Sequence, residues 1–142
     1  MKNVARLLEE KGTDVWTIDP DASVYRALEV MAEHEVGALV VVADDLPIGI
    51  ISERDYARKV ILLDRMSRDT PVAEIMTSEL ETVTYAHTIN DCMSLMTEQR
   101  IRHLPVVEDG RLVGIVSIGD VVRGVINEQQ YMIEQLEGYI TG

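Results

Sequence analysis

The sequence predicts a mixed α/β (α+β) fold made of two similar β-α-β-β-α units. Its 142 residues suit one compact domain or two small halves that share a core. When the sequence is shifted against itself by 65 residues, 17–56 aligns with 82–121 without a gap, with 11 identities in 40 positions. Within each copy, short apolar runs typical of strands alternate with segments of helical periodicity. Two copies are too few for a solenoid, so we expect two pseudo-symmetric units packed face to face.

Each copy opens with a short strand and a one-faced helix. We expect the strands at 15–18 and 81–84. Both helices carry apolar residues at positions i, i+3, i+4 and i+7, which places them on one face. These residues are Val24, Ala27, Leu28 and Met31 in the first copy and Ile89, Cys92, Met93 and Met96 in the second. Thr88 followed by Asp91 predicts a capping box at the start of the second helix.

The rest of each copy reads as a hairpin followed by a helix. The first copy has apolar strands at 38–43 and 48–51, and the second has them at 104–107 and 112–116. The Asp109-Gly110 pair between the latter two predicts a tight turn. The closing helices are expected to begin near Ser52 and Ser117.

Segments outside the repeat suggest the domain boundaries. A short helix at 4–9 ends at Gly12, and a second one at 70–76 has Thr70 as its N-cap and Pro71 in its first turn. With 64–71 as a linker, we expect a first unit at 1–63, including the N-terminal helix, and a second at 72–142, including the C-terminal helix. The apolar stripe at 121–140 is longer than one unit needs, so its last third is expected to cover a seam or a partner chain.

Composition and charge exclude several classes of protein. The 25 acidic and 13 basic residues give a formal net charge of −12, which repels nucleic acids and anionic lipids. No apolar run approaches the length of a membrane span, and the first residues lack the apolar middle of a secretory signal. The single cysteine, Cys92, cannot form an internal disulfide. We therefore expect a soluble cytoplasmic protein that binds neither nucleic acid nor membrane.

Several segments together resemble a known family. They are Val72–Thr77, Arg100–Val107 and Leu112–Asp120, with Val36–Val41 and Ile48–Asp55 in the first copy. This order resembles a tandem pair of cystathionine-β-synthase (CBS) domains, also called a Bateman module, of the stand-alone prokaryotic type. The resemblance implies two units docked sheet to sheet with two clefts, which in similar proteins bind AMP, ADP, ATP, S-adenosylmethionine or NAD-type dinucleotides. It also implies a homodimer.

The pattern Ser-x-x-Asp occurs twice, as Ser52/Asp55 and Ser117/Asp120, where a buried strand is followed by a helix. A helix start offers free N–H groups and a positive dipole end to a phosphate, and the serine hydroxyl can donate to it. An aspartate one turn on can accept both ribose hydroxyls, the role that the resemblance gives to Asp55 and Asp120. An ordinary N-cap pair has the same spacing, and the two roles are compatible.

The two copies differ in the cations that they offer. Arg102 and His103 precede the buried strand of the second copy, where the first has Gly37 and Ala38. By resemblance, polar ends at this point face ligand phosphates, and Arg102 can form a forked, charge-assisted contact. A surface pair of Arg102 with Glu98 is the alternative. Arg54 and Lys59 are the cations near the first copy's site.

The resemblance also implies an apolar slot for a base in each cleft, lined by Thr17, Ile18, Leu39 and Val40 in one and by Thr82, Val83, Leu104 and Pro105 in the other. Trp16 is a candidate for stacking on a base, although a core position is the commoner fate of such an aromatic. The complete set of predicted ligand-binding residues is Thr17, Ile18, Ala38, Leu39, Val40, Ser52, Arg54, Asp55, Lys59, Thr82, Val83, Arg102, His103, Leu104, Pro105, Ser117, Ile118 and Asp120.

No catalytic pattern stands out. The three histidines and one cysteine lack the spacing of a metal site, and neither a nucleophile elbow nor a Gly-rich phosphate loop is present. We therefore expect neither enzyme activity nor a bound metal. Three functions stay open: an adenine-nucleotide sensor that acts on an unknown protein through a change in its homodimer, a structural dimerisation module without ligand, and a nucleic-acid-binding module, which the charge disfavours.

Overall fold

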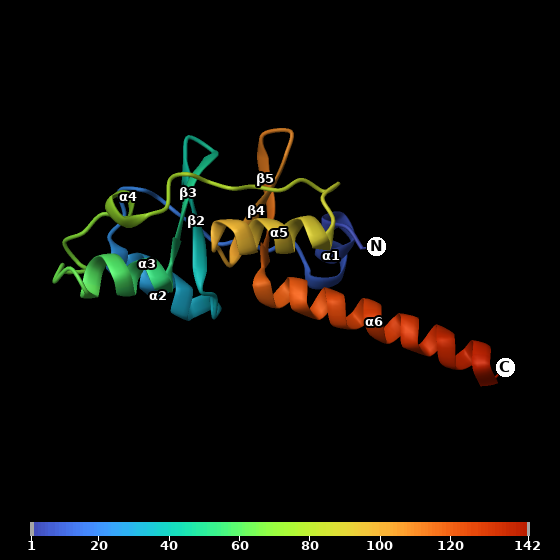
Figure 1. Cartoon of the computed structure of the whole chain (residues 1–142). Helices are drawn as coiled ribbons and strands as arrows, with labels where there is room; N and C mark the ends of the chain where they lie inside the picture. The colour runs from blue at the N-terminus through green and yellow to red at the C-terminus, as the bar shows by residue number, and fades with distance from the viewer. Residues whose placement is uncertain (1, 142) are drawn as a thin grey trace. The chain divides into compact units, whose positions relative to one another are not determined.

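The computed structural model describes residues 2–141, with side chains described as far as residue 140 (Figure 1). It confirms a mixed α/β fold with helices and two small sheets. In chain order the elements are α1 (Val4–Lys11), β1 (Thr17–Ile18), α2 (Val24–His34), β2 (Ala38–Ala43), β3 (Leu46–Ser52), α3 (Glu53–Tyr56), the π-helix η1 (Ala57–Ile61), α4 (Val72–Ile75), α5 (Ile89–Gln99), β4 (His103–Glu108), β5 (Arg111–Ser117) and α6 (Ile118–Thr141).

The chain divides into two compact units. Of the described residues, the first-repeat unit contains 14–80 together with 109–112, and the second-repeat unit contains 2–13, 81–108 and 113–141. The predicted face-to-face arrangement of the two units stays a prediction. The predicted boundaries at 63/64 and 71/72 also stay predictions, because they divide the chain by its sequence, whereas the two compact units are defined by contacts in space.

The first-repeat unit is built on a three-stranded sheet in the order β1-β2-β3. β1 is parallel to β2, with Thr17 opposite Val40, and β2 is antiparallel to β3. Val24, Ala27 and Met31 are buried along one face of α2, as the helical spacing predicted. They pack with Leu39 and Ile51 of the sheet into a single apolar cluster.

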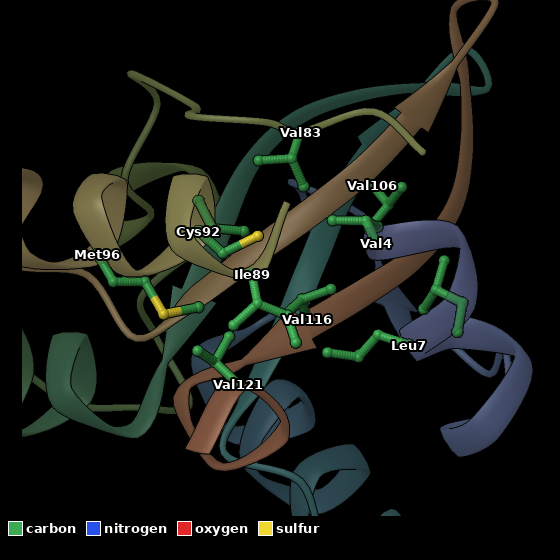
Figure 2. Close-up of a cluster of buried hydrophobic side chains, with 11 residues drawn as sticks. Val4, Leu7, Val83, Ile89, Cys92, Met96, Val106, Val116 and Val121 are labelled. Carbon is green, nitrogen blue, oxygen red and sulfur yellow. The ribbon is translucent and has the colours of Figure 1, made fainter. Parts of the chain in front are cut away.

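The second-repeat unit has the same plan with a smaller sheet of β4 and β5. Ile89, Cys92 and Met96 of α5 contact residues of β4, β5 and the start of α6, as Figure 2 shows. The predicted capping box of Thr88 and Asp91 is confirmed. Burial, with a smaller contribution from Asp91, raises the pKa of the Cys92 thiol to about 11, so this cysteine serves as a core residue.

Each helix that precedes a repeat packs on the other repeat. Val4 and Leu7 of α1 are buried in the cluster of the second-repeat unit (Figure 2). Val72 and Ile75 of α4 are buried in the cluster of the first-repeat unit. Each of these helices is therefore distant in the sequence from the apolar cluster that buries it. For this reason the repeat alignment alone could not assign the helices to a core.

Both hairpins turn through two residues. Asp44 and Asp45 have φ of 51° and 63°, and Asp109 and Gly110 have φ of 52° and 77°. Positive φ at both central residues characterises the type I′ turn, whose twist matches that of the strands it joins. The tight turn predicted at Asp109-Gly110 is confirmed.

Three local predictions were wrong. The opening strand of the first copy is only Thr17–Ile18, and in the second copy the expected strand at 81–84 is reduced to one parallel bridge between Val83 and Val106. Thr70 is not an N-cap: its hydroxyl donates to the Met66 carbonyl oxygen at 2.7 Å, and Pro71 occupies the cap position of α4 without a side-chain bond. Thr70 stabilises the preceding turn instead.

Trp16 is not a core residue, and its stacking on a base stays a prediction. It is 37% exposed, and its ring stacks on that of His34 with centroids 3.6 Å apart and planes 7° from parallel. His34 is the last residue of α2. The stacked pair therefore joins the segment before β1 to the end of α2.

The glycines aligned at 49 and 114 provide a test of these packings. A Cβ on Gly49 would lie 2.8 Å from the backbone oxygen of Thr77, whereas on Gly114 it would lie 3.0 Å from the methyl carbons of Leu8. Backbone yields less than the end of a leucine, so we expect Gly49→Ala to lower the free energy of unfolding by about 1–3 kcal/mol and Gly114→Ala by less. Urea unfolding of both variants measures this, and an equal loss would contradict the packing described.

Candidate functional site

The end of β5 and the start of α6 in the second-repeat unit form the most closely bonded polar cluster of the predicted site (Figure 1). The Ser117 backbone N–H donates to Asp120 Oδ2 at 2.8 Å, and the Asp120 N–H donates to Ser117 Oγ at 3.2 Å. These reciprocal bonds are those of an N-terminal cap, because they satisfy backbone donors of the first helical turn. In this copy the Ser-x-x-Asp pattern therefore forms an N-cap pair, as one of its two interpretations predicted.

Asp120 does more than cap the helix. Only 6% of the residue is exposed, and two cations contact its carboxylate. Lys11 Nζ lies 2.6 Å from Oδ2, and an Arg123 guanidinium nitrogen lies 2.6 Å from Oδ1. Lys11 Nζ also donates to the Ile115 carbonyl oxygen at 2.7 Å. The carboxylate is therefore buried as an anion, with charge-assisted hydrogen bonds in place of water.

The pKa of Asp120 reflects this balance. Burial by itself raises the pKa of the carboxyl group, but the hydrogen bonds from Lys11 and Ser117 and the positive charge of Lys11 outweigh it. The net result is a pKa below the ordinary value for aspartate. Asp120 is therefore ionised at neutral pH.

Arg102 and His103 lie beside this cluster. The Ile118 N–H donates to the Arg102 carbonyl oxygen at 2.9 Å, which fixes the residue before β4 against the first residue of α6. Arg102 is exposed, whereas His103 is half-buried. Burial lowers the pKa of His103, and the charges of Lys11 and Arg102 lower it further against the opposing effect of Asp120. The imidazole is therefore neutral at pH 7, and the exposed cation at the strand entrance is Arg102.

The first-repeat unit repeats the geometry with fewer charges. Ser52 and Asp55 form a full capping box, with the Ser52 N–H donating to Asp55 Oδ2 at 3.0 Å. Lys59 Nζ lies 3.3 Å from Asp55 Oδ1 and donates to the Ile75 carbonyl oxygen at 3.0 Å. The Glu53 N–H donates to the Gly37 carbonyl oxygen at 3.0 Å, matching the bond between Ile118 and Arg102. Asp55 is less buried than Asp120 and has one cationic neighbour here.

Lys11 in the second-repeat unit and Lys59 in the first-repeat unit have the same role: each ammonium group pairs with the aspartate at the helix start. In the repeat alignment Lys59 corresponds to Gly124. A Cβ at Gly124 would lie 2.8 Å from Ile89 Cδ1, so a lysine cannot stand there without displacing the core. Lys11 at the end of α1 supplies the ammonium group instead, again bonded to an aspartate and to a backbone carbonyl.

The strand residues predicted to line a base slot are brought together within each unit. Thr17 is paired with Val40 in the first-repeat unit, and the Val83 N–H donates to the Pro105 carbonyl oxygen at 3.1 Å in the second. Leu39 and Leu104 are completely buried in the two apolar clusters. Both residues are therefore part of the core.

Of the remaining predicted residues, Arg54 and Ile118 lie at the starts of α3 and α6, Thr17 and Ala38 begin β1 and β2, and Thr82 precedes Val83. Thr17, Thr82 and Arg54 are exposed, Ile118 is 47% exposed, and Ala38 is 5% exposed. Two contacts of Asp120 were missed from the sequence. Arg123 had a local signal, since it lies three residues after Asp120 and matches Arg58 after Asp55. Lys11 had none, because it lies 109 residues away in the chain.

Two further findings concern the described residues as a whole. Among residues 2–141 no group of three or more His, Cys, Asp or Glu side chains is arranged to hold a metal ion. None of the helices described is both long enough and apolar enough to cross a membrane.

Comparisons with known proteins agree on one family. The CBS domain model matches residues 4–62 and 72–127. The mitochondrial CBS domain-containing protein CBSX3 of Arabidopsis thaliana is 46% identical over 136 residues, which are 92% of this chain and 66%, just under two thirds, of that protein. The crystal structure of the CBS domain protein NE2398 is 48% identical with a TM-score of 0.85, covering 88% of this chain and 98% of that one.

A more distant structure carries ligands. The CBS domain pair of protein MJ0100, solved with 5′-methylthioadenosine and S-adenosyl-L-methionine, is 25% identical with a TM-score of 0.80. The similarity covers 90% of this chain and 98% of that one.

The ion pairs of Asp120 predict a pH dependence. We expect Asp120→Asn to lower the free energy of unfolding at pH 7 by about 1–3 kcal/mol, because the amide loses the charge-assisted bonds. The folded state holds the pKa of Asp120 below the unfolded value of about 3.9, so this stability is present above that pH and is lost as the pH falls through the folded pKa. Denaturant unfolding from pH 7 to 3 measures the difference, which a constant gap between the two proteins would contradict.

Proposed function

The chain belongs to the CBS domain family, and from this premise we propose that it is a regulatory module that binds an adenine nucleotide. The observation that carries the proposal is the buried, ionised Asp120 at the start of α6, with Arg102 and His103 beside it. A carboxylate in this position suits the two hydroxyls of a ribose, and the neighbouring cation and helix start suit a phosphate. The ligands bound by the pair of protein MJ0100 both contain adenosine, which supports this chemistry.

A purely capping role explains less of the geometry. Asp91 forms the same capping box with Thr88 at the start of α5, and its carboxylate is exposed. Asp120 has the same cap and is also buried between two cations. A helix cap requires neither burial nor a lysine from a distant helix, so we assign the additional groups to ligand binding.

The proposed ligand is AMP, ADP, ATP or NAD(H). We propose that it acts by changing the arrangement of a homodimer that an unidentified protein recognises, since a ligand shifts a conformational equilibrium by its differential affinity for the two states. The chain performs no reaction in this proposal and resides in the cytoplasm. The alternative is a structural dimerisation module whose sites stay empty.

Thermal unfolding with and without adenine nucleotides tests the proposal. Because a ligand that binds only the folded state stabilises it, millimolar AMP, ATP or NADH is expected to raise Tm by several degrees. Asp120→Ala is expected to abolish the shift while the protein stays folded by circular dichroism.

The matched control is Asp91→Ala, which removes the equivalent cap carboxylate from α5 and leaves the proposed site intact. It should lose only the stability of a cap, about 1 kcal/mol, and retain the nucleotide shift. If no adenine nucleotide shifts Tm at millimolar concentration, the structural alternative holds.

Arg102 tests the phosphate part of the site. A charge-assisted hydrogen bond contributes about 1.5–3 kcal/mol, so Arg102→Gln is expected to weaken AMP binding roughly ten- to a hundredfold. It should leave 5′-methylthioadenosine, which has no phosphate, nearly unaffected. Isothermal titration with both ligands measures the ratio, and the exposed Arg111→Gln serves as control. Equal losses for both ligands would place Arg102 away from the phosphate.

A further inference from the structure

The carboxylate of Asp120 has little free capacity to accept a further hydrogen bond. A carboxylate offers about four acceptor positions, two on each oxygen. Oδ2 accepts from the Ser117 backbone N–H at 2.8 Å and from the Lys11 ammonium group at 2.6 Å. Oδ1 accepts from a guanidinium nitrogen of Arg123 at 2.6 Å. Most of the acceptor positions are therefore filled, whereas the two hydroxyls of a ribose need two that are free.

One of these donors has to leave when a ribose binds to Asp120. The Ser117 N–H is held by the cap, because the Asp120 N–H donates back to Ser117 Oγ at 3.2 Å. Lys11 Nζ is held twice, since it also donates to the Ile115 carbonyl oxygen, and its side chain is 27% exposed. Arg123 has Asp120 as its one hydrogen-bond partner among the described residues, and its side chain is 69% exposed. Arg123 is therefore the donor that leaves at the lowest cost.

The guanidinium group of Arg123 lies over the first turn of α6. A Cβ built on Gly119 would lie 3.5 Å from one terminal nitrogen of Arg123 and 3.9 Å from the other. These are ordinary van der Waals distances, so the charged group packs across Gly119 beside the helix start, where the proposed function puts a phosphate. A small movement of this exposed side chain takes it off the carboxylate and leaves it close to the same helix start.

On the premise of the proposed function, we propose that Arg123 makes this site selective for phosphorylated adenosines over adenosine itself. Ribose binding displaces the guanidinium group from Asp120, and the freed group pairs with the 5′-phosphate of the same ligand, as its forked geometry favours. The phosphate is attached to the sugar ring that carries the two hydroxyls, so it lies near a side chain one turn from Asp120. A nucleotide therefore replaces the ion pair that it breaks, whereas adenosine breaks the pair without replacing it.

This role differs from the role proposed for Arg102. Arg102 gains a contact when a phosphate binds, so its loss weakens nucleotide binding and leaves ligands without a phosphate nearly unaffected. Arg123 gives up a contact before it gains one, so its loss removes an obstacle to every ligand with a ribose. The effect on adenosine therefore has a different sign in the two variants.

The first-repeat unit provides a matched control. Arg58 aligns with Arg123 and also follows its aspartate by three residues. Among the described residues, however, Asp55 has its ion pair with Lys59, at 3.3 Å, and none with Arg58. Arg58 is exposed and is not one of the predicted ligand-binding residues. Arg58→Gln therefore removes the equivalent charge without releasing an aspartate.

Isothermal titration of the full chain with AMP and with adenosine, which differ only in the phosphate, tests the proposal. Arg123→Gln is expected to tighten adenosine binding by about three- to thirtyfold, since the broken pair joins an exposed cation to a buried carboxylate. AMP binding is expected to change by less than about threefold, because the variant loses the phosphate contact together with the ion pair that opposes binding. The preference for AMP over adenosine therefore falls, whereas Arg58→Gln should leave it unchanged.

The Arg123 variant should remain folded by circular dichroism, because Lys11 and Ser117 still bond to Asp120. Other results would overturn the proposal in distinguishable ways. Equal tightening of both ligands would mean that Arg123 competes for Asp120 and does not reach the phosphate. Weaker binding of AMP alone would make Arg123 an ordinary phosphate contact, and equal weakening of both ligands would reduce the ion pair to a structural one.

The unmodified protein separates this proposal from the proposed function. If AMP binds to it and Arg123→Gln leaves the preference for AMP unchanged, the selectivity role fails and the nucleotide site stands. If neither AMP nor adenosine binds to it at millimolar concentration, the proposed function fails and the selectivity role fails with it.

Discussion

The ion pair between Lys11 and Asp120 is the contact on which the second-repeat unit and its site both depend. It joins the last turn of α1 to the first turn of α6, with Nζ and Oδ2 at 2.6 Å. A carboxylate that is 6% exposed requires such a partner, because an uncompensated buried charge costs several kcal/mol. The apolar residues of α1 attach the helix to the core, and the pair fixes where its C-terminal end lies.

Internal symmetry explains why this cation comes from so far away. In the first-repeat unit the lysine stands one turn after the aspartate on the same segment, as Lys59 after Asp55. In the second, a glycine packed on Ile89 takes that position, and the closing helix continues beyond it as α6. The same chemistry is thus rebuilt with a residue from another element. An ion pair that is rebuilt from another element in this way is better explained by a shared need for the cation than by helix capping, which Ser117 already provides.

Much of the fold could be predicted because its signals are local. The helical stripe of Ile89, Cys92 and Met96, the Thr88 cap and the Asp109-Gly110 turn each depend on residues within one or two turns of chain. The same is true of the Ser-x-x-Asp pairs. What could not be predicted depends on distant contacts: Lys11 reaching Asp120, α1 packing on the second repeat, and Trp16 stacking on His34. Thr70 failed for a different and local reason: its hydroxyl donates to the Met66 carbonyl oxygen four residues earlier, and Pro71 takes the cap position of α4.

The distribution of charge matters more than its total. A net charge of −12 opposes the approach of any anion, yet Lys11 and Arg123 contact Asp120 at the start of α6, and the Arg102 carbonyl oxygen accepts from Ile118 there. Beyond about 10 Å the acidic surface is screened at physiological ionic strength, whereas contacts inside a half-buried site are screened much less. An anion that approaches this helix start therefore meets a weak long-range repulsion and a stronger local attraction.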